Sequence, residues 1–277
     1  MDLSWLQSLL LGLLSGFAEL VPVSSQAHEG ILLRLFGAGS ATPAFELFIH
    51  IAVLLALLTG LWNSLNRLRR EQRIARIPRK RRSRQPDRKL LMDMRLLKTA
   101  VLPMLVVMIL RIRFGERKMD AVWLSVFLIL NGILLYIPQH LPAGNKDSRM
   151  LSRLDGVGMG VAAGLGALPG VSGVGASISF LSARGADRQY AADISLMLCI
   201  PVMIISLALD AYAVVLTGFG GLSGGLLFKY VLAAAAAYIG AYSGIVLTRF
   251  LAVKIGYTGF AYYSWGLALF AFILYMI

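Results

Sequence analysis

Long apolar segments, two of them broken by proline, are the feature that most constrains this chain. A membrane-spanning helix needs about 20 mostly apolar residues and must satisfy its own backbone hydrogen bonds. The chain is 58% hydrophobic and 15% charged, whereas about a quarter of a soluble domain is charged. We therefore expect an all-α polytopic membrane protein with about six transmembrane helices. The unbroken segments are 44–63, 96–112, 120–138, 189–217, 226–250 and 257–277.

Two further apolar segments, 4–35 and 156–184, are interrupted at Pro22 and Pro169. Proline removes a backbone donor and clashes with the preceding turn, and each half is then too short to cross a bilayer comfortably. Broken pairs of this kind are typical of re-entrant helical hairpins that meet near the bilayer midplane. A proline-kinked spanning helix is the alternative interpretation.

A basic loop at 64–95 predicts the orientation in the membrane, because it holds most of the net charge of +13. Positive residues collect in cytoplasmic loops and also attract anionic headgroups, so a cytoplasmic loop is favoured over a nucleic-acid site. The first hairpin then enters from the outside and the second from the cytoplasm. Arg113, Arg117 and Lys118 conflict with this topology, which puts them outside.

A weak internal repeat relates the two halves of the chain. Residues 16–25 resemble 164–172, and each segment is followed by a second half-helix and then by spans. The two copies would insert with opposite orientation, as in proteins built from inverted-topology repeats. We predict a single integral membrane domain, 1–277, with repeat 1 at about 1–138 and repeat 2 at about 152–277.

Chemically active side chains gather at the first break. Ser24 and Ser25 begin the second half-helix, Glu19 ends the first, and His28 lies about one turn further on. Free N–H groups at a helix N-terminus bind anions, and ionisable groups at membrane depth are costly and usually functional. Glu19 suits a metal ligand or base, and His28 a proton carrier. The alternatives are a buried Glu19–His28 pair and serines that only cap the helix.

The second break, at 169–177, is rich in glycine and serine. Successive N–H groups around Gly173 and Gly175 can form an anion-binding nest, but small residues also favour tight helix packing in membranes. Spacing alone gives these two interpretations equal weight.

Further ionisable residues occur in other spans, among them Glu46, His50 and Asp210. Glu46 and His50 lie one turn apart on one helix face, where they either line the same cavity or sit at the membrane interface. Asp210 interrupts an apolar segment, and the sequence names no partner for it.

In these motifs the chain resembles the bacterial undecaprenyl-diphosphate phosphatases of the bacitracin-resistance type. Residues 15–28, SGFAELVPVSSQAH, are similar to that family's E-G-x-T-E-F-x-P-V-S-S-T-G-H. Residues 169–177, PGVSGVGAS, are similar to its P-G-x-S-R-S-G-x-T, and 45–50 resemble its F-[DE]-x-x-x-[QH]. The likeness covers nearly the whole chain in order.

The resemblance implies a hydrolase of the bacterial cell membrane. Its reaction would convert undecaprenyl diphosphate to the monophosphate carrier lipid and phosphate at an outward-facing site, in support of peptidoglycan synthesis and bacitracin resistance. The likeness further implies a divalent cation, Mg²⁺ or Ca²⁺. Expected partners are the polyprenyl diphosphate and membrane lipids, with no nucleic acid, and we also consider a homodimer.

The same resemblance assigns roles to individual residues. Glu19, Ser25 and His28 match catalytic positions, with Glu19 also a metal ligand. Glu46 and His50 are accessory candidates. The substrate-binding positions are Ser24, Ser172, Gly173, Gly175 and Ser177.

Two departures from the motifs bear on activity. Ser15 stands where the family has its first glutamate, and Gly173 stands where it has an arginine. An arginine recognises phosphate with two parallel hydrogen bonds, and losing such a contact costs about 10²–10³ in rate. The competing hypothesis is therefore a catalytically degenerate paralogue that transports or binds polyprenyl-phosphate lipids.

Overall fold

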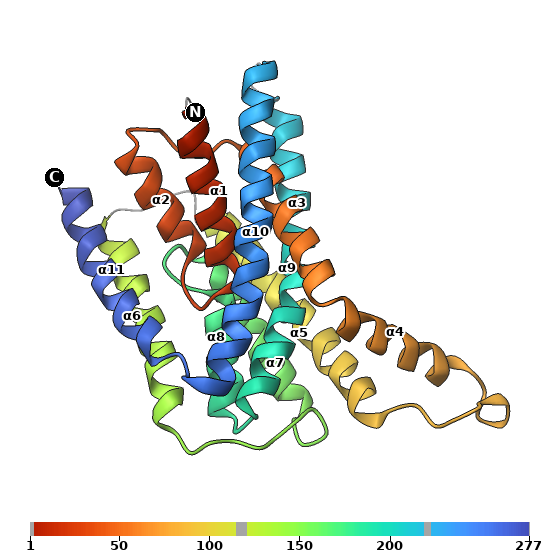
Figure 1. The fold of residues 1–277 in the computed structure, drawn as a ribbon. Coiled ribbons are helices and arrows are strands. Elements are labelled where there is room, and N and C mark those ends of the chain that lie inside the picture. Colours follow the sequence, from red (N-terminus) through yellow and green to blue (C-terminus); the bar gives the residue numbers. More distant parts are fainter. Residues whose placement is uncertain (1–2, 115–120, 219–222, 277) are drawn as a thin grey trace.

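The computed structural model describes residues 3–114, 121–218 and 223–276, and these ranges are helical without a β-strand (Figure 1). Three of the helices are short 3₁₀ turns: η1 (Arg79–Arg81), η2 (Ile137–His140) and η3 (Leu165–Ala167). The α-helices are α1 (Trp5–Leu20), α2 (Ser25–Leu35), α3 (Pro43–Gly60), α4 (Trp62–Arg76), α5 (Arg88–Phe114), α6 (Ala121–Tyr136), α7 (Arg153–Gly164), α8 (Gly173–Ala183), α9 (Arg188–Thr217), α10 (Gly224–Lys254) and α11 (Thr258–Met276).

The predicted polytopic membrane architecture is confirmed. Five helical segments in the described ranges are long and apolar enough to cross a membrane, namely α3, α6 with η2, α9, α10 and α11. The sixth predicted span, 96–112, falls within α5, which is 27 residues long but has a charged N-terminal part. At about 1.5 Å per residue, α5 is long enough to cross the hydrocarbon core.

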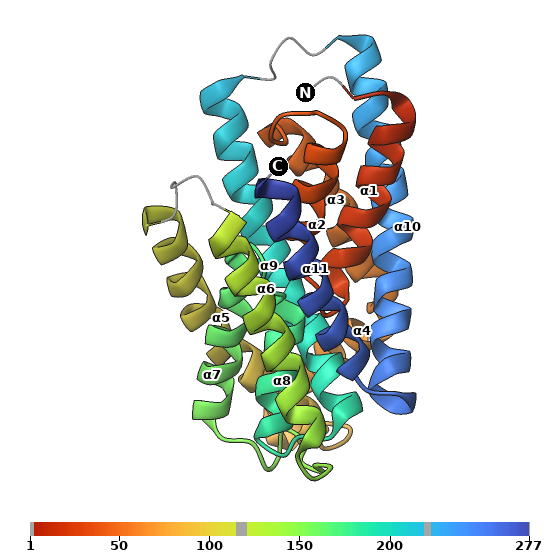
Figure 2. The same cartoon turned by 90° about the vertical axis from the view of Figure 1, so that its left-hand side faces the viewer.

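The two interrupted segments form helical hairpins rather than kinked spanning helices. In the first, α1 ends at Leu20, and α2 begins at Ser25 and packs back against α1. In the second, α7 ends at Gly164, and α8 begins at Gly173 and packs back against α7. The two hairpins enter the bundle from opposite ends, the first from the end where both chain termini lie (Figures 1 and 2).

The tips of the two hairpins are hydrogen bonded to each other at the centre of the bundle. Ser24 Oγ accepts a hydrogen bond from the Gly170 N–H at 2.9 Å, and Ser172 Oγ donates to the Val21 carbonyl at 3.2 Å. Asn131 of α6 joins both tips, since its side chain donates to the Pro22 carbonyl and accepts from the Ser172 N–H. These bonds satisfy backbone groups that lipid could not.

The first helix of each hairpin packs against a long helix of the other half of the chain. In the α1–α10 contact, a side chain at Gly12 or Gly16 would collide with the facing backbone of α10. In the α5–α7 contact, a side chain at Gly160 would collide with the α5 backbone. Small residues allow this close approach in membranes. The two predicted repeats stay a prediction.

The basic segment projects from the bundle as α4 and the beginning of α5 (Figure 1). Much of it is therefore helical, not an irregular loop. Its fold is organised by Glu71, which is 3% exposed, binds the Arg84 guanidinium and accepts from the Asp87 N–H. These hydrogen bonds, led by the one from Arg84, lower the pKa of Glu71 to about 2. Of the conflicting residues in the predicted topology, Arg117 and Lys118, and the side chain of Arg113, lie outside what the structure describes.

Candidate functional site

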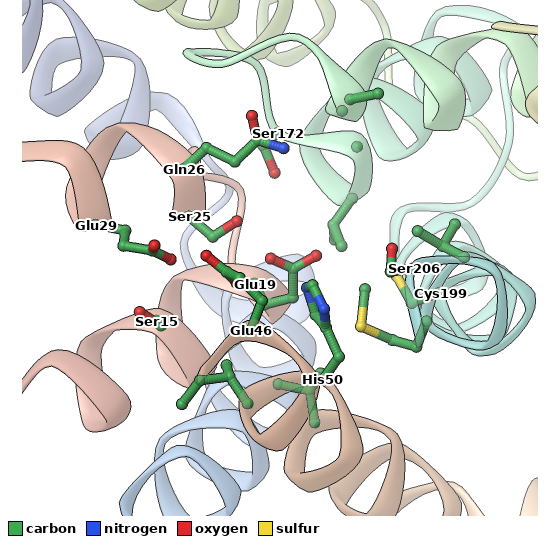
Figure 3. Close-up of a pocket in the computed structure, with 18 of the residues that line it drawn as sticks. Ser15, Glu19, Ser25, Gln26, Glu29, Glu46, His50, Ser172, Cys199 and Ser206 are labelled. Atoms are coloured by element: carbon green, nitrogen blue, oxygen red, sulfur yellow. The ribbon is translucent and has the colours of Figure 1, made fainter. Parts of the chain in front are cut away.

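A cavity of about 580 Å³ lies where the two hairpins meet α3 and α9 (Figure 3). It gathers side chains from elements far apart in the sequence, which is how a membrane bundle builds a site at its centre. Its polar lining residues include Ser15, Glu19, Ser25, Gln26 and Glu29 of the first hairpin, Glu46 and His50 of α3, Ser172 and Ser177 of the second hairpin, and Ser195, Ser206 and Asp210 of α9.

Carboxylates converge in this cavity. The side chains of Glu19, Glu29 and Glu46 point toward one another and toward Ser25 (Figure 3). Glu29 reaches the cavity because it follows Ser25 by one helical turn on the same face of α2. The cavity thus gathers carboxyl groups from α1, α2 and α3.

His50 is bound to Asp210 across the cavity. His50 Nδ1 lies 2.5 Å from Asp210 Oδ2, and the two side chains are 19% and 17% exposed. The pair links α3 to α9, and it supplies Asp210 with the partner that its sequence position did not reveal. Glu46 and His50 both line the cavity, as one of the two interpretations of their spacing expects.

The two serines at the first break have different surroundings. Ser24 is the N-cap of α2: its hydroxyl accepts from the Ala27 N–H and from Gly170, and the residue does not line the cavity. Ser25 is the first residue of α2 and lines the cavity. Capping therefore occupies Ser24 and leaves Ser25 available to a ligand.

Two helices begin at the cavity wall. Helix α2 starts with Ser25 and Gln26, and α8 starts with Gly173 and Val174 after the N-cap Ser172. All five of these residues line the cavity. The first N–H groups of a helix have no partner within it and carry part of the positive end of its dipole. The arrangement favours an anion, phosphate in particular.

Two buried hydroxyls in the cavity wall point to a polar ligand. Ser15 and Ser195 are 4% and 1% exposed and line the cavity, and neither hydroxyl has a hydrogen-bond partner within the described structure. Buried polar atoms are nearly always satisfied by protein, water or ligand. Ser15 thus presents a hydroxyl to the cavity at the position where the resemblance leads us to expect a glutamate.

His28 lies outside the cavity, although the sequence predicted it as catalytic. Its ring stacks on Tyr263 of α11, with Nδ1 2.6 Å from the Ser24 carbonyl and Nε2 2.6 Å from the Tyr263 hydroxyl. A carbonyl only accepts, so Nδ1 carries the proton and Nε2 accepts from Tyr263. Both ring nitrogens are engaged, and the expected pair with Glu19 does not form. The sequence offered no signal for Tyr263 as a partner.

Close packing accounts for much of the glycine in the second break. A Cβ at Gly173 would lie 2.7 Å from the Ala163 carbonyl oxygen, so the packing of α8 against α7 leaves no room for a side chain at this position. Gly170 has a φ of +105°, a conformation that other residues rarely adopt. Ser177 lines the cavity with its hydroxyl bound to the Gly173 carbonyl, whereas Gly175 does not line it.

No lysine or arginine is among the described residues that line the cavity. The nearest arginines in sequence are engaged elsewhere. Arg184 ends α8 and binds Asp155 at 2.5 Å, and Arg188 donates to the Gln139 carbonyl. Neither of them lines the cavity.

A divalent cation suits the cavity by donor type. Mg²⁺ and Ca²⁺ prefer carboxylate oxygens, and Glu19 and Glu29 present them side by side. Among the described residues, no three histidine, cysteine, aspartate or glutamate side chains are already arranged to hold a metal ion. The cation therefore stays a prediction.

Comparison with known proteins identifies the family of this chain. Residues 8–270 match the family described as bacitracin resistance protein BacA. Among similar curated proteins, the undecaprenyl-diphosphatase of Carboxydothermus hydrogenoformans is 29% identical over 260 residues, which cover 94% of this chain and 93% of the relative. The undecaprenyl-diphosphatase of Thermodesulfovibrio yellowstonii is 28% identical over 278 residues, covering 97% and 96%. Because the family match spans nearly the entire sequence, this chain belongs to the BacA bacitracin resistance family.

Proposed function

We propose that this protein hydrolyses a polyprenyl diphosphate, undecaprenyl diphosphate in the bacterial cell, to the monophosphate carrier lipid and inorganic phosphate. The printed name of its relatives, undecaprenyl-diphosphatase, supports this substrate, and the reaction would return the carrier to peptidoglycan synthesis. Assembly as a homodimer stays a prediction.

One observation carries the proposal: Glu19 and Ser25 point into the same cavity at the N-terminus of α2 (Figure 3). The N–H groups of α2 and α8 would bind oxygens of the terminal phosphate. The hydroxyl of Ser25 is not used as the helix cap, and a carboxylate lies beside it to take its proton. This is the composition of an activated nucleophile next to its base.

The chemical steps follow from that pair. Ser25 Oγ bonds to the terminal phosphorus, the bond from phosphorus to the bridging oxygen breaks, and the polyprenyl monophosphate leaves with that electron pair. The Ser25 proton passes to the Glu19 carboxylate, which releases it to water. Water then attacks the phosphoserine: its oxygen bonds to phosphorus, the bond from phosphorus to Ser25 Oγ breaks with its electron pair left on Oγ, one of the water protons passes to Oγ, and phosphate leaves. A bound Mg²⁺ or Ca²⁺, held by Glu19 and Glu29, would supply charge neutralisation of the diphosphate.

His28 has a supporting role in this scheme. Its bonds to Ser24 and Tyr263 fix the start of α2 against α11, so it would hold the nucleophile-bearing helix in place. Its catalytic assignment by resemblance is the part of the site that the geometry supports least.

We further propose that the cavity faces the outside of the cell membrane and that the arm formed by α4 and the beginning of α5 is cytoplasmic. The charge of that arm supports this orientation. Replacing the single cysteine, Cys199, gives a background for new cysteines at residues 40 and 80. In intact cells an impermeant maleimide should label residue 40 only, and labelling of residue 80 alone would reverse the orientation.

The function is tested by phosphate release from C15 or C55 polyprenyl diphosphate with purified protein, Mg²⁺ or Ca²⁺ and detergent. Ser25→Ala should abolish release, whereas the matched Ser243→Ala, whose hydroxyl bonds within α10, should retain it within about twofold. Phosphorylated Ser25 should be detectable by mass spectrometry after an acid quench. Release that continues in Ser25→Ala would remove Ser25 as nucleophile.

A lipid-binding or transport role is the second candidate, and it is favoured because the cavity lining, as far as the structure describes it, includes no lysine or arginine. In that case the folded protein should bind polyprenyl diphosphate but release phosphate no faster than the Ser25→Ala variant does. That result would overturn the phosphatase proposal.

A further inference from the structure

The cavity has an unusual charge balance for a site that takes a diphosphate. Glu19, Glu29, Glu46 and Asp210 all line it, and the described lining residues include no lysine or arginine. These carboxylates would repel an anionic ligand, and the repulsion is stronger inside the protein than in bulk water because the effective dielectric constant is lower there. Only one described lining residue, His50, has a side chain that can become a cation near neutral pH.

The bond to Asp210 orients this imidazole. Asp210 Oδ2 accepts from Nδ1 of His50 at 2.5 Å, so Nδ1 carries a proton and the ring is fixed between α3 and α9. Within the described residues, no hydrogen bond is made to Nε2, and the ring is directed toward the centre of the cavity (Figure 3). The second ring nitrogen is therefore presented to whatever the cavity holds.

The acidic groups around His50 come from each helix that packs there. Glu46 precedes it by one turn on α3, Asp210 faces it from α9, and Glu29 and Glu19 approach from α2 and α1. Glu46 and Glu29 also line the cavity, but Asp210 is the carboxylate in direct contact with His50, and this contact stabilises the protonated ring.

We propose that His50, oriented by Asp210, is the phosphate-binding cation of this cavity and donates an Nε2–H hydrogen bond to the terminal phosphate of a diphosphate lipid. The diphosphate ligand rests on the proposed function, but the contact does not depend on hydrolysis. His50 is a ligand contact, and Asp210 is a positioning residue that acts through it.

The contrast with His28 sharpens this assignment. His28 uses both ring nitrogens within the protein and lies outside the cavity, whereas His50 uses one and presents the other. Of the two imidazoles predicted from the sequence, the accessory one has the geometry to meet the ligand.

The test is equilibrium binding of farnesyl methylenediphosphonate, a diphosphate analogue whose P–C–P link cannot be hydrolysed. His50→Gln should weaken binding by about tenfold or more, the effect of losing a charge-assisted hydrogen bond. His50→Arg, which keeps a cation, should bind within about fivefold of the wild type. The matched control is His140→Gln. The ring of His140, in η2, is hydrogen bonded to the Tyr136 carbonyl and does not line the cavity, so this variant should bind the analogue within about twofold of the wild type.

Two further measurements separate ligand contact from a structural role. Asp210→Asn should weaken analogue binding less than His50→Gln does, and Asp210→Glu should restore it in part. Added imidazole should recover binding to His50→Gly, because it fills the vacated volume with the same donor. Each variant is first shown to be monodisperse with an unchanged melting temperature; His50→Arg provides the decision if the smaller variants do not fold.

The outcomes distinguish this inference from the phosphatase proposal. Analogue binding by His50→Gln within twofold of the wild type overturns the inference, even where the wild type hydrolyses its substrate. Absence of analogue binding by the wild type also overturns it. His50-dependent binding without any phosphate release supports the inference and rejects the phosphatase proposal.

Discussion

The two hairpins have the same backbone plan but contribute different chemistry to the cavity. In each, a serine caps the second helix and also bonds the opposite hairpin, and that helix begins at the cavity wall. The first hairpin adds ionisable side chains, Glu19 and Glu29. The second adds no charged side chain among the described lining residues, only backbone N–H groups, small residues and Ser177.

The difference shows how one half of a symmetric plan can carry reactive groups while the other is constrained by packing. Gly173 in the second hairpin is enclosed by the Ala163 carbonyl, whereas the equivalent start of the first hairpin has room for Ser25 and Gln26 at the cavity. The first hairpin thus supplies the ionisable side chains of the cavity, and the second supplies small residues that allow close helix packing. Substitutions in the two hairpins should therefore differ in their effects.

The largest effect is expected from the carboxylate of the first hairpin. Glu19→Gln keeps the size of the side chain but removes its ability to accept a proton, so kcat should fall by about 10³. Phosphate release at saturating lipid measures it. Ser177→Ala, in the second hairpin, should lose less than about tenfold, because its hydroxyl already bonds the Gly173 carbonyl. Equal losses in the two variants would contradict this difference between the hairpins.

Placing an arginine at 173 should lower the stability and the activity of the protein. A Cβ there meets the Ala163 backbone, so Gly173→Ala and Gly173→Arg should both lower stability by about 1–3 kcal/mol and reduce activity. Gly39→Ala is the control, since nothing lies within 4 Å of its added Cβ. Thermal melting in detergent measures all three, and a faster Gly173→Arg enzyme would contradict the packing argument.

The capping serines should be equivalent despite the different chemistry of their hairpins. Ser24→Ala and Ser172→Ala each remove one cap and one bond between the hairpins, and each should cost about 1–2 kcal/mol of unfolding free energy. Denaturant titration compares them. A loss confined to Ser24→Ala would show that only the first hairpin depends on its cap.

A smaller change in activity is expected at His28. Tyr263→Phe removes one hydrogen bond to its ring, and it should lower stability by about 1 kcal/mol and kcat by less than about tenfold. His28→Gln should behave similarly. Loss of activity on the scale of Glu19→Gln, without loss of stability, would return His28 to the catalytic group.

The smallest effect on catalysis should come from the arm, far from both hairpins. Glu71→Gln should leave phosphate release within about twofold. Because Arg84 holds the pKa of Glu71 near 2, below that of an unfolded glutamate, its contribution to arm structure is complete above about pH 4.3 and is lost as the pH falls toward 2. A spin label at residue 80 should gain mobility over that range in the wild type only.

Much of the fold was predictable because it depends on apolar length and on proline, which act locally. The breaks at Pro22 and Pro169 located both hairpins, and the spans appear as helices close to the expected bounds. The arm was taken as a loop because its charge hid its helical character, which the buried Glu71 organises through long-range bonds.

The site was predicted less completely, because its geometry depends on pairs distant in sequence. Glu19, Ser25, Glu46 and His50 were named and do share the cavity. Glu29 was recognisable by its one-turn spacing from Ser25. The His50–Asp210 and His28–Tyr263 contacts join residues 160 and 235 positions apart, and no local pattern encodes such contacts.

The crosswise bonds between the hairpin tips have a consequence for biosynthesis. Ser24 and Gly170 are 146 residues apart, so the first hairpin leaves the ribosome and enters the membrane long before its partner exists. During that interval its tip has neither Gly170 nor Asn131 to bind, and its polar backbone must be kept from lipid by water or by the insertion machinery. A nascent chain arrested before residue 131 should therefore be a substrate for membrane quality-control proteases, while one that has emerged past α8 should be resistant.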